Sequence, residues 1–166
     1  MRINVKLYSK LSTCGVYTLL LFFSKDTTLT VGKLGVQMFP KGYYCYTGSA
    51  RGSGSTNLKH RIGRHLKKEK RMFWHIDYVL KNQNVSVEAV VAAETKKKLE
   101  CNINSYLKNS RITKVLVMGF GSSDCRKNCG SHLLYFPEIK KIDCLVQGLV
   151  ENLKLLKDVH SVVLIE

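Results

Sequence analysis

The chain has 166 residues, 45% of them hydrophobic and 23% charged, which fits one folded domain and excludes a disordered protein. Its 27 lysines and arginines against 12 acidic residues give a net charge of +15, which favours a polyanionic partner, most often nucleic acid. The most apolar run, residues 16–23, is much shorter than the roughly 20 residues of a membrane-spanning helix. With no secretion signal before it, we expect a cytoplasmic protein with reduced cysteines and no membrane partner.

The first half of the chain is rich in strand formers. β-branched and aromatic residues predict a strand over Gly15–Phe23, and a weaker strand over Leu29–Phe39 is interrupted by glycines. A turn at residues 40–42 then leads into a third strand, Tyr43–Ser49. Because the connections are short, these three strands predict an antiparallel meander.

The second half alternates helical and strand patterns. Asn57 is a plausible cap for a helix over Asn57–Lys70, and a short helix fits Phe73–Lys81. An amphipathic helix is indicated by the spacing of Leu99, Ile103, Tyr106 and Leu107. A Gly-rich loop over residues 119–131 follows, and further elements are predicted at Val87–Glu94 (strand), 132–136 (strand), 138–157 (helix) and 159–165 (strand).

Two tyrosines are expected to lie near each other at the ends of neighbouring strands. Period-two alternation places Tyr44 and Tyr46 on one face of the third strand and Tyr43 and Cys45 on the other. In the first strand, Tyr17 shares a face with two leucines. If the two strands are adjacent, the phenols of Tyr17 and Tyr46 could converge.

Charged residues flank the apolar faces of two predicted helices. At 3.6 residues per turn, Arg61 and His65 lie next to each other beside the apolar stripe of the Asn57–Lys70 helix. By the same geometry Glu100 lies at the edge of the apolar face of its helix, after three lysines. A carboxylate so placed is a candidate ligand for a hard divalent cation.

Taken in order, these residues resemble the GIY-YIG nuclease superfamily. The matching features are "GVY" at residues 15–17, "YTG" at 46–48, Arg61 followed by His65, and Glu100 in an amphipathic helix. The stretches "GYYCYTGSA", "RIGRHL", "WHIDYVL", "LECNINSYL" and "GFGSSDC...SHLLYF" more closely resemble its DUF123 branch, whose members occur alone or joined to a repair glycosylase of the endonuclease III type. Since the resemblance covers about Gly15–Phe136, we expect one domain over residues 1–166, with that core and a C-terminal extension over 137–166.

The resemblance implies a fold and an activity. We expect an α+β fold, in which a small central, mostly antiparallel sheet is flanked by helices and followed by a C-terminal helix and strand. The implied activity is that of an endonuclease, a metal-dependent hydrolase of nucleic-acid phosphodiesters, with a link to DNA repair. The alternative is a catalytically inactive nucleic-acid-binding accessory module, with a repair glycosylase of the endonuclease III type as a partner.

The resemblance also implies residue roles. Tyr17 would act as general base or orient the attacking water, and Tyr46 would help to place it. Arg61, assisted by His65, would hold the phosphate and offset its growing charge. Glu100 would hold Mg²⁺ or Mn²⁺. We expect the nucleic acid to be DNA, with contacts from Ser49, Arg51, Lys59, Arg64, Lys67 and Lys68.

A second kind of metal site is suggested by "CRKNCGSH". It places Cys125, Cys129 and His132 at a C-x₃-C-x₂-H spacing compatible with zinc, with Cys144 as a fourth ligand. The alternative interpretation is that these cysteines are plain loop residues. A zinc-stabilised interaction domain is thus a third hypothesis beside the nuclease and the binding module.

Overall fold

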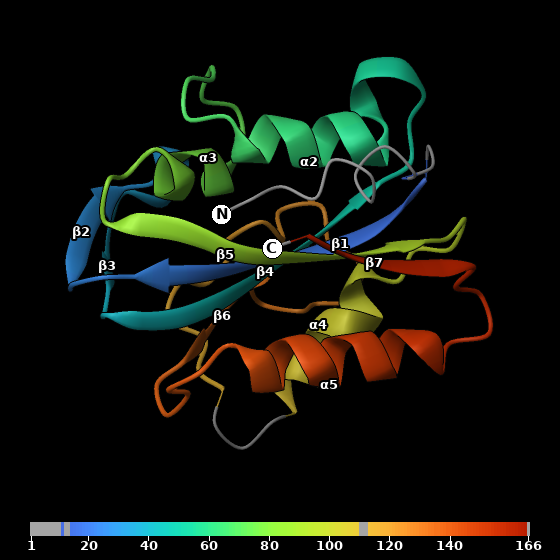
Figure 1. Ribbon diagram of the computed structural model, residues 1–166. Coiled ribbons are helices and arrows are strands. Elements are labelled where there is room, and N and C mark those ends of the chain that lie inside the picture. Colours follow the sequence, from blue (N-terminus) through green and yellow to red (C-terminus); the bar gives the residue numbers. More distant parts are fainter. Residues whose placement is uncertain (1–10, 12–13, 110–112, 166) are drawn as a thin grey trace.

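A five-stranded antiparallel sheet forms the centre of the molecule (Figure 1). The computed structural model describes residues 11, 14–109 and 113–165. The strand order is β6-β4-β1-β5-β7. Their bounds are Gly15–Phe23 for β1, Gly42–Ala50 for β4, Val85–Glu94 for β5, Leu133–Phe136 for β6 and Ser161–Ile165 for β7. The predicted α+β fold with a mostly antiparallel sheet is confirmed.

The central strand β1 pairs along its whole length with β4 on one side and β5 on the other. Its β-branched, leucine and aromatic residues suit this place, because a strand covered on both faces has no polar side to present. The register sets Tyr17 opposite Gly48 and Leu19 opposite Tyr46. The two predicted tyrosine strands are therefore direct neighbours.

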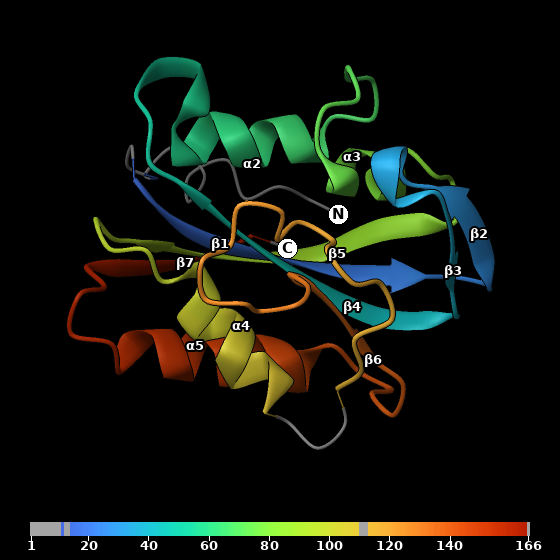
Figure 2. The ribbon, with the colours of Figure 1, turned by 180° about the vertical axis from the view of Figure 1, so that it is seen from behind.

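Helices cover both faces of the sheet (Figures 1 and 2). On one face lie α2 (Leu58–Leu66) and α3 (His75–Leu80), and on the other lie α4 (Glu100–Lys108) and α5 (Asp143–Lys154). Asn57 caps α2 as predicted, accepting a hydrogen bond from the His60 amide at 2.8 Å. The helix ends at Leu66, earlier than predicted, because the basic run that follows has no apolar residue to bury against the sheet.

The predicted three-stranded meander is wrong. β2 (Thr27–Thr30) and β3 (Val36–Phe39) pair with each other in a separate two-stranded sheet, and β1 pairs with β4 instead. The chain reverses between β2 and β3 through a short 3₁₀ turn, η1 (Gly32–Leu34), with positive φ at Gly32 (48°) and Gly35 (71°), a conformation that glycine adopts readily. The two glycines that interrupt the predicted Leu29–Phe39 strand therefore belong to the turn between β2 and β3.

The predicted C-terminal helix and strand are present, although the helix begins later than expected. β7 pairs with β5 from Val90↔Ile165 to Glu94↔Ser161, so the predicted extension supplies an edge strand of the main sheet. A second short 3₁₀ turn, η2 (Gly54–Thr56), lies between β4 and α2. Within the described part of the chain, none of the helices has the length and apolar character needed to cross a bilayer.

Candidate functional site

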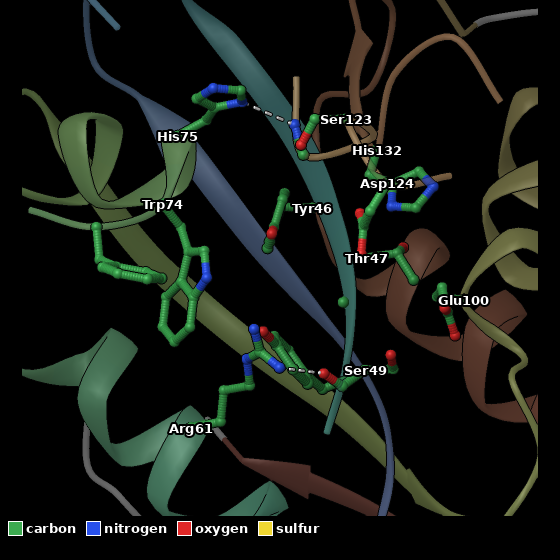
Figure 3. A pocket seen from close by; sticks show the side chains of 14 residues that line it. Tyr46, Thr47, Ser49, Arg61, Trp74, His75, Glu100, Ser123, Asp124 and His132 are labelled. Atoms are coloured by element: carbon green, nitrogen blue, oxygen red, sulfur yellow. Dashed lines mark hydrogen bonds between the residues drawn. The ribbon is translucent and has the colours of Figure 1, made fainter. Parts of the chain in front are cut away.

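A pocket of about 310 Å³ opens where β4 runs past the end of β6 (Figure 3). The β4–β6 pairing stops at Tyr46↔Leu133, and the Thr47 amide donates the next hydrogen bond to the carbonyl of His132, at 3.0 Å. Side chains from both faces of the sheet can therefore meet around this stretch of β4. The lining residues are Tyr17, Tyr46, Thr47, Gly48, Ser49, Arg61, Phe73, Trp74, His75, Glu100, Gly121, Ser123, Asp124 and His132.

Tyr17 and Tyr46 both line this pocket, on the sheet face covered by α2 and α3. The Tyr17 hydroxyl lies 2.8 Å from Nε2 of His65, whose side chain is buried beneath α2. Gly48 makes room for this phenol, because a Cβ at Gly48 would lie 2.6 Å from the Tyr17 oxygen. The glycine of "YTG" is thus explained by the tyrosine of "GVY".

Burial keeps the Tyr17 and His65 side chains neutral. It raises the pKa of Tyr17 well above its usual value, and the nearby Tyr46 adds to the rise although Arg61 opposes it. Burial also lowers the pKa of His65 to about 3, with Lys70 contributing in the same direction. The cation Arg61 therefore does not lower the pKa of the Tyr17 phenol below its usual value, because burial outweighs it. A neutral phenol bonded to a neutral imidazole can orient a water molecule.

Arg61 reaches the pocket from α2. Its Nη1 donates a hydrogen bond of 2.7 Å to the carbonyl of Ser49 on β4, and its guanidinium lies 4.3 Å from the centre of the Trp74 ring. Its Nε is buried and has no hydrogen-bond partner among the described residues. The side chain is thus held in place while further N–H donors remain for a ligand, and Figure 3 shows it across β4 from Glu100.

Glu100 reaches the same pocket from the opposite face of the sheet, as the first residue of α4. Its Oε2 is buried, and no group in the described part of the chain bonds to it. Asp124, in the loop before β6, lines the pocket on the same side of β4 (Figure 3). A buried carboxylate oxygen left unpaired is costly, so a cation is the ligand that this carboxylate fits best.

Arg64 lies apart from this lining. Its Nη1 and Nη2 bind the two carboxylate oxygens of Asp77 at 2.8 and 2.9 Å, and Nη2 also donates to the carbonyl of Arg71. Although burial alone would raise the pKa of Asp77, hydrogen bonds from Arg64 and from the amides of Trp74 and Phe73 lower it. This arrangement gives Arg64 a structural part in joining α2 to α3.

The other predicted nucleic-acid contacts differ in their exposure and in their place relative to the pocket. Arg51, Lys67 and Lys68 are exposed, Lys59 is half-buried, and Ser49 lines the pocket itself. Arg51 donates to the carbonyl of Lys96 at 3.4 Å, which places it beside the exposed lysines that precede Glu100. Basic side chains from two segments therefore border the Glu100 side of the pocket.

Several lining residues were not predicted from the sequence. Phe73 and Trp74 directly precede α3. His75 accepts a hydrogen bond at Nδ1 from the Gly121 amide at 3.1 Å, which ties α3 to the loop that carries Asp124. The only sequence signal for these residues was their clustering in "WHIDYVL" and in the Gly-rich loop.

A second group of side chains lies next to the pocket. One ligand atom each from Cys101, Cys125, Cys129 and His132 can be chosen so that all four lie within 4.8 Å of one another. Cys144, predicted as the fourth ligand, is not in this group and is exposed on α5, whereas Cys101 from α4 is in it. Burial alone would raise the pKa of Cys125, but hydrogen bonds from the Cys129 and Lys127 amides and from neighbouring thiols lower it to about 6.

Comparison with known proteins agrees with the DUF123 resemblance described in the sequence analysis. A family model described as domain of unknown function DUF123 matches residues 16–155. The chain belongs to the DUF123 family. No curated protein and no solved structure matches it. The match includes Tyr17, Arg61 and Glu100, so the candidate pocket is built from the part of the chain that defines this DUF123 protein.

Proposed function

We propose that this DUF123 protein is a metal-dependent endonuclease that hydrolyses nucleic-acid phosphodiesters. The observation that carries the proposal is that one pocket gathers Tyr17 and Tyr46 from paired strands, Arg61 from α2 and Glu100 from α4. These are the residues on which the resemblance to GIY-YIG nucleases rests. The net charge of +15 supports a nucleic-acid substrate, for which we propose DNA.

Each side chain has a task that its contacts allow. In hydrolysis, water attacks phosphorus and releases a proton to solvent while the bond to the leaving oxygen breaks, and negative charge grows on the phosphoryl oxygens. Arg61, fixed by Ser49 and Trp74, offsets that charge with a guanidinium that needs no reorientation. The neutral Tyr17, held by His65, accepts a hydrogen bond from the water and aims it, with Tyr46 beside it.

The implied metal fits the carboxylates of the pocket. Glu100 offers a buried oxygen without a partner among the described residues, and Asp124 lines the same side of β4. Mg²⁺ or Mn²⁺ bound there would polarise the phosphate and stabilise the leaving oxygen. A repair glycosylase of the endonuclease III type, the partner that the resemblance implies, belongs to the same proposal.

The test is cleavage of labelled single-stranded, double-stranded and branched DNA and RNA with Mg²⁺ or Mn²⁺. We expect Glu100→Gln and Arg61→Ala each to reduce the cleavage rate about 10²- to 10³-fold, the usual scale for one lost electrostatic group. Binding by Glu100→Gln should stay close to wild type. Glu151→Gln, on the exposed side of α5, is the matched control and should cleave normally.

Two outcomes would contradict the proposal in different ways. Wild-type binding without cleavage of any substrate would replace it with the alternative, a catalytically inactive accessory module. Cleavage that persists in Glu100→Gln would leave a nuclease but remove this pocket as its site.

A further inference from the structure

Three cysteines and one histidine converge beside the pocket from two separate segments of the chain. Cys101 is the second residue of α4, Cys125 and Cys129 belong to the loop over residues 119–131, and His132 directly precedes β6. The sulfur atoms of Cys101 and Cys125 are 3.5 Å apart. His132 is buried, and its Nε2 has no hydrogen-bond partner in the described part of the chain.

The donor set selects the kind of ion. Three thiolates and one imidazole are soft and borderline ligands, which suit zinc, whereas Mg²⁺ and Mn²⁺ take oxygen ligands. In a tetrahedral site with Zn–S bonds of about 2.3 Å, neighbouring sulfurs are about 3.8 Å apart. The 3.5 Å between the Cys101 and Cys125 sulfurs, and the 4.8 Å within which all four ligand atoms lie, are therefore compatible with one zinc ion.

The loop is folded so that its cysteines return to one point. The Gly119 amide donates to the Gly130 carbonyl at 2.7 Å and closes the base of the loop. Asn128 has a φ of 52°, the one positive value found at a non-glycine residue among those described, and it turns the chain back so that Cys129 meets Cys125. Lys108 on α4 donates to the Cys129 carbonyl, which adds a positive charge near the thiols.

We propose that Cys101, Cys125, Cys129 and His132 bind one structural zinc ion. Four protein ligands complete a tetrahedral shell and leave no open position for a substrate, so the ion stabilises rather than reacts. It joins the Asp124 loop to α4 next to Glu100, and so fixes the two carboxylates of the pocket relative to each other. This site does not depend on the proposed nuclease activity.

The experiment measures zinc in the purified full-length protein, produced with zinc and kept reduced, by plasma mass spectrometry. We expect one equivalent per chain in the wild type and a small fraction of that in Cys101→Ser and Cys129→Ser. Cys144→Ser, an exposed cysteine outside the group, is the matched control and should keep its zinc. Replacing zinc by Co²⁺ in the wild type should give the intense absorption bands of tetrahedral thiolate coordination.

A readout on the wild type alone keeps the proposal testable if the serine variants fail to fold. Alkylation followed by peptide mass spectrometry should show Cys101, Cys125 and Cys129 protected until a chelator is added, with Cys144 modified throughout. The proposal is overturned if the zinc-exposed wild type carries no zinc, if Cys144→Ser loses as much zinc as Cys101→Ser, or if Cys101 and Cys125 form a disulfide under reducing conditions. No result on nucleic-acid cleavage changes these outcomes.

Discussion

The Tyr17 hydroxyl lies 2.8 Å from Nε2 of His65, and both side chains are almost completely buried although 48 residues separate them in the chain. Because each side chain is the hydrogen-bond partner of the other, they should act as one unit. We expect Tyr17→Phe and His65→Asn each to reduce cleavage about 10²-fold, and the double variant to be little worse than either single one.

The control for this cycle is Tyr44→Phe. Tyr44 is a buried tyrosine on the same face of β4 as Tyr46, but its hydroxyl donates to the carbonyl of Pro40, away from the pocket. Single-turnover cleavage rates of the wild type, the two single variants, the double variant and the Tyr44→Phe control test whether Tyr17 and His65 act as one unit. Losses that simply multiply in the double variant would show that the two side chains act independently.

Patterns with a short period predicted much of this site. Side-chain alternation placed Tyr46 with Tyr44 on one face of its strand and Tyr17 with two leucines on one face of the other, and the structure has both groups so, because the period of a strand is set by its own backbone. The angular positions of Arg61, His65 and Glu100 followed in the same way from helix geometry. Their convergence also required the direct pairing of β1 with β4, which the predicted meander did not contain.

The features that were missed depend on contacts between distant segments. Cys101 precedes Cys125 by 24 residues and lies on a helix, so no ligand spacing connects them in the sequence. Asp124 and His75 come together in the pocket because the Gly-rich loop lies against Tyr46 of β4 and is bonded to His75 of α3. The separate β2–β3 hairpin was missed because glycine interruptions fit a weak strand and a turn equally well.

The buried His65 should make stability depend on pH in a defined direction. Its pKa is about 3 in the folded protein against 6.5 in the unfolded chain, so between these values the unfolded state binds more protons. The histidine's contribution is therefore complete above pH 6.5 and is lost as pH falls toward 3, by at most about 1.4 kcal/mol per pH unit.

Chemical denaturation at pH 7, 6 and 5 measures this slope above the range in which most carboxylates titrate. The free energy of unfolding should fall with pH in the wild type and less steeply in His65→Gln. His60→Gln, which changes an exposed histidine of the same helix, should keep the wild-type slope. Equal slopes in the wild type and His65→Gln would show that His65 is not kept neutral by the fold.

Gly48 should be intolerant of any side chain. A Cβ there would lie 2.6 Å from the hydroxyl and 2.8 Å from Cζ of Tyr17, and the ring of Tyr17 is packed in the core. We expect Gly48→Ala to displace Tyr17, to lower the free energy of unfolding by about 1–3 kcal/mol and to reduce cleavage. Gly148→Ala in α5, where the new Cβ has more room, is the control. Normal cleavage by Gly48→Ala would contradict the need for this placement of Tyr17.

Substitutions of Arg64 and of the lysines that follow α2 should have different effects, the first on stability and the others on nucleic-acid affinity. Removing Arg64 leaves the fully buried carboxylate of Asp77 without its ion-pair partner, so we expect Arg64→Ala to cost about 3 kcal/mol of unfolding free energy. Lys67→Ala and Lys68→Ala should leave stability unchanged and weaken nucleic-acid binding, with a smaller dependence of affinity on salt. Thermal unfolding and binding titrations at two salt concentrations distinguish the two classes.

Phe73 is an exposed aromatic residue of the pocket that is expected to stack on a nucleic-acid base. It lines the pocket, yet 76% of it is accessible, and it meets Trp74 edge to face with ring centres 5.3 Å apart. A base stacked on an aromatic ring contributes about 1–3 kcal/mol, so Phe73→Ala should weaken binding of single-stranded DNA roughly 5- to 150-fold. Phe73→Leu should restore little, because stacking needs a ring. Met38→Ala removes a similarly exposed apolar side chain on the hairpin and should bind normally, and an equal loss in that control would reduce Phe73 to an ordinary surface residue.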